Sequence, residues 1–259
     1  MKSGLKGKVV LVTGGAGGIG TQISKAFSEE GAKVIIHYHQ SEKNAGKLAN
    51  DLGCRTIKAD LTDSNQANSL FLQAIEMEGG IDICIANAGF YPKQSTNLWN
   101  IKDKRWNDTI NTNLSLTFNT SREFLKHASK TKQGSLVLVG STAGIYGEAG
   151  HSDYAAAKGA IISGLLNTLK NEVAQIGDGV RVNAVAPGWT LTNKKLKDSL
   201  DDSDVKKITS TMALKKLATP EDVANSIVML ASNKLSNHVT GQIIEIAGGM
   251  EGRQITGIK

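Results

Sequence analysis

Cysteine and proline are scarce in this chain of 259 residues, which contains 2 cysteines and 3 prolines. Cys54 and Cys84 are too few for the disulfide framework of a small secreted scaffold, and they lack the clustered Cys/His spacing of a zinc site. We therefore expect no metal, two buried thiols and a reducing, cytoplasmic location. The 40% hydrophobic content is typical of an ordered globular protein rather than a disordered or fibrous one.

Long apolar runs are also missing from the sequence. No run approaches the roughly 18 residues that cross a bilayer, and residues 1–8 contain no apolar stretch, so we expect neither a membrane segment nor an export signal. The net charge of +6 comes from scattered basic residues, and an acidic stretch at 198–204 separates the two densest lysine clusters. This distribution argues against a nucleic-acid partner.

What the chain does contain is a series of short, continuous apolar runs, each followed by a segment of helical length. Continuous rather than alternating apolar character is typical of strands that helices cover on both faces. The pattern therefore predicts one domain over 1–259 with a doubly wound, parallel, seven-stranded α/β fold. The predicted strands lie at 8–12, 33–38, 55–59, 81–86, 135–140, 180–186 and 242–247. Helical spacing of apolar residues marks 19–30, 64–77, 154–174 and 220–231, the last beginning with a proline suited to a first helical turn.

One region, 190–217, is polar and lysine-rich and has only weak periodicity. Two interpretations remain open from the residues alone. The segment is either an irregular surface excursion or a mobile lid over a site.

A glycine-rich turn, TGGAGGIG, follows the first predicted strand at 13–20 and leads into a helix. Glycines there permit positive φ and close ligand approach, and a helix start presents unpaired N–H groups, so the turn suits a pyrophosphate. Two glycine registers fit, G-x-G-x-x-G from Gly15 and G-x-x-x-G-x-G from Gly14, and spacing does not separate them. A plain tight turn is the structural alternative.

The dinucleotide fingerprint also predicts an acidic residue at the end of the second strand. This chain has His37, Tyr38, His39 and Gln40 there, followed by Lys43. Without a carboxylate to repel a 2′-phosphate, and with His37, His39 and Lys43 as donors, NADP(H) is weakly favoured over NAD(H). The alternative is that these histidines are ordinary residues at a strand end.

Tyr154 and Lys158 are separated by four positions, which places them on one face of a helix. A free phenol has a pKa of about 10, and a cation within ~4–6 Å would lower it. The pair therefore predicts a tyrosine that exchanges protons. An isolated Y-x-x-x-K is more often a solvated helix face, so its meaning depends on the surrounding motifs.

Read together, these motifs resemble those of the short-chain dehydrogenase/reductase superfamily, especially its 3-oxoacyl-acyl-carrier-protein reductases of about 250 residues. The resemblance covers nearly the whole chain and selects the Gly14 register. It rests on pieces in the family's order and spacing: Thr13, Gly14, Gly18, Gly20, Asp60, Leu61, Asn87, Ala88, Gly89, Asn113, Ser141, Tyr154, Lys158, Pro187, Gly188 and Thr192.

The resemblance implies a hydride transfer between nicotinamide and a carbonyl or secondary alcohol. Tyr154 would exchange the proton, Lys158 would lower its pKa and bind the nicotinamide ribose, Ser141 would orient the carbonyl, and Asn113 would relay protons through a water. Residues implied in cofactor binding are Thr13, Gly14, Gly18, Ile19, Gly20, His37, Asp60, Leu61, Asn87, Ala88, Gly89, Tyr154, Lys158, Pro187, Gly188, Thr190 and Thr192.

Several of these residues also have purely structural interpretations. The run Asn111, Thr112 and Asn113 suits a helix irregularity, because asparagine and threonine compete for backbone hydrogen bonds, although a cap is the alternative. Without the resemblance, Asp60 would be interpreted as a helix cap. Near the matched motifs, candidate substrate contacts that could equally be packing residues are Phe90, Tyr91, Tyr146, Glu148, His151 and Trp189.

Departures from the family pattern lie at 216–218 and 247–249, away from the implied chemistry, and they weaken close identity with the acyl-carrier-protein reductases. A 3-oxoacyl-type ketone is the first substrate class expected, and a sugar or polyol dehydrogenase is the enzymatic alternative. A catalytically silent dinucleotide sensor or interaction protein is a further alternative. The resemblance also implies a small-molecule substrate and a homotetramer, or less often a dimer, that uses helices near 104–130 and 154–175.

Overall fold

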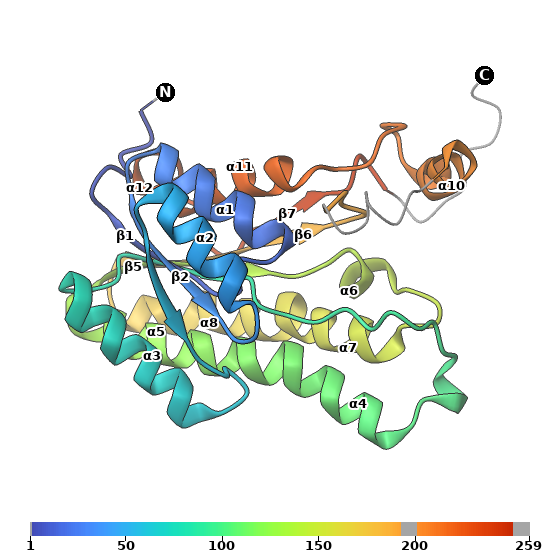
Figure 1. The fold of residues 1–259 in the computed structure, drawn as a ribbon, viewed down its shortest axis with the longest axis horizontal. Coiled ribbons are helices and arrows are strands. Elements are labelled where there is room, and N and C mark those ends of the chain that lie inside the picture. Colours follow the sequence, from blue (N-terminus) through green and yellow to red (C-terminus); the bar gives the residue numbers. More distant parts are fainter. Residues whose placement is uncertain (1, 193–200, 251–259) are drawn as a thin grey trace.

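A computed structural model describes residues 2–192 and 201–250. Its centre is one parallel seven-stranded sheet with the strand order β3-β2-β1-β4-β5-β6-β7 (Figure 1). The strands are β1 (Val9–Val12), β2 (Lys33–Tyr38), β3 (Arg55–Lys58), β4 (Ile83–Ala86), β5 (Gln133–Val139), β6 (Gly179–Pro187) and β7 (Ile243–Ile246). The predicted fold class is confirmed, and each predicted strand lies within two residues of an observed one.

Strands β1 and β4, in the middle of the sheet, are apolar throughout because helices cover both faces of the sheet. Every residue of β1 and of β4 is buried. One face packs against α1 (Gly18–Glu29), α2 (Glu42–Leu52) and α11 (Pro220–Ala231). The opposite face packs against α3 (Ser64–Glu78), α5 (Leu116–Thr131) and α8 (Leu166–Glu172), so the core forms two layers separated by the sheet (Figure 1).

The remaining helical elements are short or interrupt longer helices. They are η1 (Leu98–Asn100), α4 (Asp103–Ile110), the π-helix η2 (Asn111–Ser115), α6 (Ala143–Tyr146), α7 (Ser152–Gly159), the π-helix η3 (Ala160–Leu165), η4 (Val173–Gln175), α10 (Asp202–Ile208), η5 (Thr209–Thr211) and α12 (Asn233–Ser236). The predicted helix at 154–174 is therefore a continuous run of α-helical, π-helical and 3₁₀ segments. None of the helices in the described part of the chain is long and apolar enough to cross a membrane.

Local sequence accounts for where several helices begin. Thr219 accepts a hydrogen bond from the backbone N–H of Asp222, whose carboxylate accepts one from the backbone N–H of Thr219, and Pro220 follows at the first position. The predicted start of α11 is thus confirmed. Helix α3 begins at a different carboxylate from the one that the sequence suggested, because Asp63 rather than Asp60 caps it.

From β1 the chain adds β2 and then β3 on one side of the sheet, and it then adds β4 to β7 on the other side of β1. The direction of strand addition therefore changes between β1 and β4. In open α/β sheets, ligands bind beyond the carboxyl ends of the strands at this switch point. The sequence motifs that follow β1, β4, β5 and β6 all lie at this edge of the sheet.

Candidate active site

The glycine turn after β1 has the geometry that a pyrophosphate site requires. Gly14 has φ +60°, a Cβ on Gly20 would overlap the carbonyl oxygen of Gly14, and a Cβ on Gly18 would lie 2.8 Å from the Thr192 side chain. Gly17 precedes α1 and has no side chain to cap it, so a phosphate could take that place at the N–H groups of the first turn, where the helix dipole is positive. The turn therefore fits a dinucleotide phosphate.

The loops after β1 and β4 are tied together by Thr13. Its hydroxyl accepts hydrogen bonds from the backbone N–H groups of Asn87 and Ala88, at 3.0 Å each, and donates to the carbonyl of Ile85 at 3.1 Å. The Asn87 amide in turn donates to the Thr13 carbonyl at 2.9 Å. The glycine turn and the loop after β4, both predicted to bind the cofactor, are therefore held together by the hydrogen bonds of Thr13.

His37 has a different role from the one that the sequence suggested. The side chain is 2% exposed, its Nδ1 accepts a hydrogen bond from the Gly14 N–H at 3.0 Å, and its Nε2 lies 3.0 Å from the Ala59 carbonyl. This arrangement makes Nε2 the protonated nitrogen. Burial lowers the pKa of His37 to about 4. The prediction that His37 offers a donor to a 2′-phosphate is therefore wrong, because this neutral ring supports the glycine turn from inside.

Asp60 and Leu61 follow β3 at the same edge. The Asp60 carboxylate accepts hydrogen bonds from the Thr62 N–H at 2.9 Å and hydroxyl at 2.7 Å, and it lies 3.9 Å from Nε2 of His39. Burial tends to raise the pKa of Asp60, but the bonds from Thr62 and the charge of His39 outweigh it and the net shift is downward. Leu61 is buried in the core, so its backbone rather than its side chain faces this edge.

Tyr154 and Lys158 lie on α7 and face the same space. The Lys158 ammonium is 5.8 Å from the centre of the Tyr154 ring and donates to the Val139 carbonyl, at the end of β5, at 2.9 Å. Ser141, two residues beyond that strand, interacts with the Tyr154 hydroxyl and thereby lowers the pKa of the phenol. Three of the predicted catalytic residues therefore meet at the carboxyl end of β5.

Burial is the main cause of the shifted pKa values of Tyr154 and Lys158. It raises the pKa of Tyr154 to about 12, with the nearby charge of Glu148 acting in the same direction against Ser141. It lowers the pKa of Lys158 to about 8. The net shift of the Tyr154 pKa is therefore upward, because burial and the charge of Glu148 outweigh the hydrogen bond of Ser141. The role predicted for Lys158 in lowering this pKa stays a prediction. The phenol keeps its proton at neutral pH, which suits a proton donor.

Asn113 lies in the π-helix η2, so the predicted irregularity is confirmed. Its side-chain amide donates to the carbonyls of Phe90 at 2.9 Å and Thr109 at 3.0 Å, and its Oδ1 accepts from the Phe90 N–H at 3.2 Å. A Cβ on Gly89 would lie 2.9 Å from Oδ1 of Asn113 and 3.4 Å from Nζ of Lys158. Gly89 thus allows the loop after β4 to approach both of these side chains.

The turn after β6 is a further segment predicted to bind the cofactor at this edge of the sheet. The Gly188 N–H donates to the Ile246 carbonyl at 3.0 Å, and the buried Thr190 hydroxyl donates to the Gly188 carbonyl at 3.0 Å. Thr192 lies against Gly18, so this turn packs directly against the glycine turn. Within the predicted lid at 190–217, the structure places α10 and η5, while 193–200 lie outside the described residues.

The candidate substrate contacts divide into exposed and buried side chains. Tyr91 packs edge-on against Tyr154, with 5.0 Å between ring centres, and stacks on His151 at 4.7 Å. His151 is buried and its Nε2 lies 3.0 Å from the Pro92 carbonyl, so it is mainly a packing residue. Tyr146, whose hydroxyl donates to Glu245 at 2.7 Å, and Trp189 are both more exposed.

Sequence reasoning missed one ion pair that supports the site. Asp153, directly before Tyr154, is fully buried and accepts hydrogen bonds from Arg105 of α4 at 2.9 Å and from the Thr109 hydroxyl at 2.9 Å. A carboxylate beside the tyrosine was visible in the sequence. Its partner, 48 positions earlier, carried no signal in the sequence.

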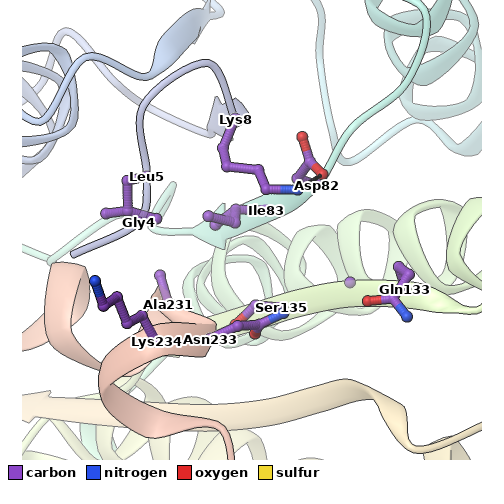
Figure 2. A pocket seen from close by; sticks show the side chains of 11 residues that line it. Gly4, Leu5, Lys8, Asp82, Ile83, Gln133, Ser135, Ala231, Asn233 and Lys234 are labelled. Atoms are coloured by element: carbon purple, nitrogen blue, oxygen red, sulfur yellow. Dashed lines mark hydrogen bonds and ion pairs between the residues drawn. The ribbon is translucent and has the colours of Figure 1, made fainter. Parts of the chain in front are cut away.

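A separate pocket lies at the opposite edge of the sheet, near the amino ends of β1, β4 and β5. Figure 2 shows Lys8, Asp82 and Ser135 among its lining residues, and Lys8 pairs with Asp82 at 2.8 Å. None of the predicted site residues lines it. It is therefore distinct from the candidate active site.

Comparison with known proteins agrees with this geometry. A family model described as Enoyl-(Acyl carrier protein) reductase matches residues 14–251. The chain is 36% identical to the 3-oxoacyl-[acyl-carrier-protein] reductase of Thermotoga maritima over 95% of this chain and 98% of the relative. Proteins of the same name from Vibrio harveyi and Escherichia coli (strain K12) are 35% and 34% identical over 95% of this chain and 98% of each relative.

The match spans the glycine turn, the Tyr154 and Lys158 pair and the turn after β6, which the fold brings to one edge of the sheet. A full-length family match combined with this arrangement identifies the class of protein. The chain belongs to the short-chain dehydrogenase/reductase superfamily and is an NAD(P)-dependent oxidoreductase.

Proposed function

We propose that this enzyme reduces the ketone of a 3-oxoacyl compound to the corresponding alcohol, with Tyr154 as the proton donor. The observation that carries the proposal is the meeting of Ser141, Tyr154 and Lys158 at the carboxyl end of β5, where burial favours the protonated phenol as the donor to the developing alkoxide. The names of the three relatives support the substrate class.

Each member of the catalytic group has a distinct task in this proposal. Ser141 and Tyr154 hold the ketone oxygen, and Tyr154 passes its proton to that oxygen as charge develops on it. Lys158, anchored by the Val139 carbonyl, sits close enough to receive the nicotinamide ribose and to stabilise the phenolate that remains. Asn113 fixes the loop after β4 beside Lys158. The bound nicotinamide supplies the hydride.

The residues that we propose to line the cofactor site lie in the turns that follow the strands. They are Thr13, Gly14, Gly18, Gly20 and Thr192, together with the neighbouring predicted residues Ile19, Asp60, Leu61, Asn87, Ala88, Gly89, Pro187, Gly188 and Thr190. We propose NADPH as the preferred form. The supporting features are the absence of a carboxylate from residues 37–40 and the presence of His39 and Lys43 close to the end of β2. His37 no longer counts as a donor, which leaves His39 and Lys43 as the residues to test.

We also propose a homotetramer built on the faces of α4, α5 and the helix that begins with α7. Two large side chains on this surface, Trp106 at 37% and Phe118 at 47% exposure, support burial against a second copy. Size-exclusion chromatography with light scattering measures the assembly state directly. A monomer at micromolar concentration would overturn this part of the proposal.

The test of the proposed function is NADPH oxidation in the presence of 3-oxoacyl thioesters, compared with the reduction of NADP⁺ and NAD⁺ in the presence of neutral sugars and polyols, both followed by absorbance. The Tyr154→Phe variant removes only the hydroxyl, and we expect its kcat to fall by roughly 10²- to 10⁴-fold while NADPH binding, followed by fluorescence, persists. Full turnover by Tyr154→Phe would refute the assigned proton donor. Turnover confined to sugars or polyols would refute the substrate class.

A further inference from the structure

A carboxylate is held beside the proton donor by residues that the proposed mechanism does not use. The Tyr91 hydroxyl donates to Oε1 of Glu148 at 2.5 Å, and the Tyr91 ring lies edge-on against the Tyr154 ring with 5.0 Å between their centres. Nδ1 of His151 lies 3.6 Å from the same Glu148 oxygen. Glu148 is therefore separated from Tyr154 by a single aromatic ring.

The position of this carboxylate is fixed by its neighbours. Burial raises the pKa of Tyr91, and the hydrogen bond to Glu148 adds to that shift, so the Tyr91 hydroxyl keeps its proton and remains a donor. His151 stacks on the Tyr91 ring and is itself bound to the Pro92 carbonyl. The Glu148 side chain is 30% exposed, so its carboxylate is partly accessible.

The negative charge of Glu148 acts on the hydroxyl of Tyr154, the proposed proton donor. It is the charged neighbour that helps to raise the pKa of Tyr154, after burial. Of the two cations nearby, Arg105 pairs with the carboxylate of Asp153, whereas Lys158 donates to the neutral Val139 carbonyl and lies on the same helix as Tyr154. A ketone that reaches the Tyr154 hydroxyl with its neighbouring substituents on the Tyr91 side brings those substituents toward this negative charge.

Resting on the proposed ketone reduction, we infer that Glu148 is a specificity-determining residue that selects neutral 3-oxoacyl compounds over 3-oxo acid anions. In a 3-oxoacyl ester or thioester, the carbonyl two bonds from the ketone carbon is uncharged. In the free acid, a carboxylate occupies that place and meets Glu148 with like charge in a partly dehydrated site. The repulsion applies to the anion alone.

The experiment compares two substrates with one carbon skeleton, neutral ethyl 3-oxobutanoate and the 3-oxobutanoate anion, in the wild-type enzyme and in Glu148→Gln. The readout is the ratio of kcat/KM for the anion to that for the ester. This ratio cancels any effect of the substitution on Tyr154, because both substrates take their proton from the same hydroxyl. We expect Glu148→Gln to raise the ratio roughly tenfold.

Glu245→Gln is the matched control, since Glu245 also accepts a tyrosine hydroxyl, that of Tyr146, but on β7. We expect it to leave the ratio unchanged. On the unmodified enzyme, higher ionic strength should raise the ratio because salt screens the repulsion. A ratio that responds neither to Glu148→Gln nor to salt overturns this inference while ketone reduction stands. A wild-type enzyme that reduces neither ketone overturns both.

Discussion

The carboxylate of Asp153 and the guanidinium of Arg105 form a buried ion pair directly behind the proposed proton donor. Nε of Arg105 lies 2.9 Å from Oδ2 of Asp153, and Nη1 of Arg105 donates to the Gln94 carbonyl at 2.7 Å and to the Thr96 hydroxyl at 2.6 Å. The pair thus joins α4, the loop at 94–96 and the first turn of α7. It fixes the segment from which Tyr154 projects.

Replacing Arg105 by Met should strongly destabilise the protein, because the fully buried Asp153 would be left without its cation. We expect the free energy of unfolding to fall by about 2–3 kcal/mol, measured by urea denaturation. Lys104→Met is the control, since Lys104 and its partner Asp108 are exposed, and it should cost less than about 0.5 kcal/mol. Equal effects of the two substitutions would contradict the assigned role of the buried pair.

The pH dependence of ketone reduction should report Lys158. Its pKa of about 8 lies far below the Tyr154 pKa of about 12, so Lys158 loses its proton first as the pH rises. We expect kcat/KM for the ketone to be level below about pH 8 and to decline above it, since this parameter reflects groups of the free enzyme. Lys158→Met should reduce activity at every pH and abolish this decline. A wild-type profile that stays level through pH 8 would show that Lys158 ionisation does not matter.

His37→Ala should destabilise the fold and His39→Ala should not. Removing the His37 ring leaves the Gly14 N–H and the Ala59 carbonyl without their partner in the interior, at an expected cost of about 2–4 kcal/mol. His39 is half-exposed, so its loss should change stability by less than about 0.5 kcal/mol but weaken NADPH binding relative to NADH. Thermal denaturation and cofactor titration measure the two effects. A greater loss of NADPH preference in His37→Ala would restore the original interpretation of that residue.

Acid should remove the stabilisation that depends on neutral His37. Its pKa in the folded chain is about 4, below the ordinary value of 6.5, so the unfolded chain binds the proton first as the pH falls. Stability is therefore fully present above about pH 6.5 and lost between there and pH 4, by about 3 kcal/mol in total. The stability difference between wild type and His37→Gln, followed from pH 7 to about 4, should shrink over this window. A constant difference would mean that His37 is not the titrating group.

Two glycine-to-alanine changes should have opposite effects. In Gly20→Ala the new methyl group collides with the Gly14 carbonyl oxygen, so we expect a loss of stability above about 2 kcal/mol and loss of cofactor binding. Gly46 lies inside α2 with open space around it, and Gly46→Ala should stabilise by about 0.5–1 kcal/mol. Denaturation and cofactor titration of both variants test this pair. Tolerance of alanine at Gly20 would contradict the close packing of the turn.

The sheet could be predicted from the sequence because burial of strands on both faces requires continuous apolar runs, and those runs are local. The runs at 33–38 and 180–186 correspond to β2 and β6 within one residue. Site residues next to strand ends, such as Ser141 and Asn87, were predictable for the same reason, since a parallel sheet brings its strand ends together. The irregularity around Asn113 also had a local cause in the helix-weakening run of polar residues.

Properties that depend on what surrounds a side chain could not be predicted. His37 looked like a phosphate donor because it ends a strand, yet its ring turns inward to the glycine turn. Spacing placed Lys158 beside Tyr154 correctly, but it did not reveal that burial raises the pKa of the phenol. By itself the sequence determined where the strands lie along the chain and which chemical groups follow them. Only the tertiary structure decided their charge states and the pairing of Arg105 with Asp153, because hydration and distant contacts exist only once the chain has folded.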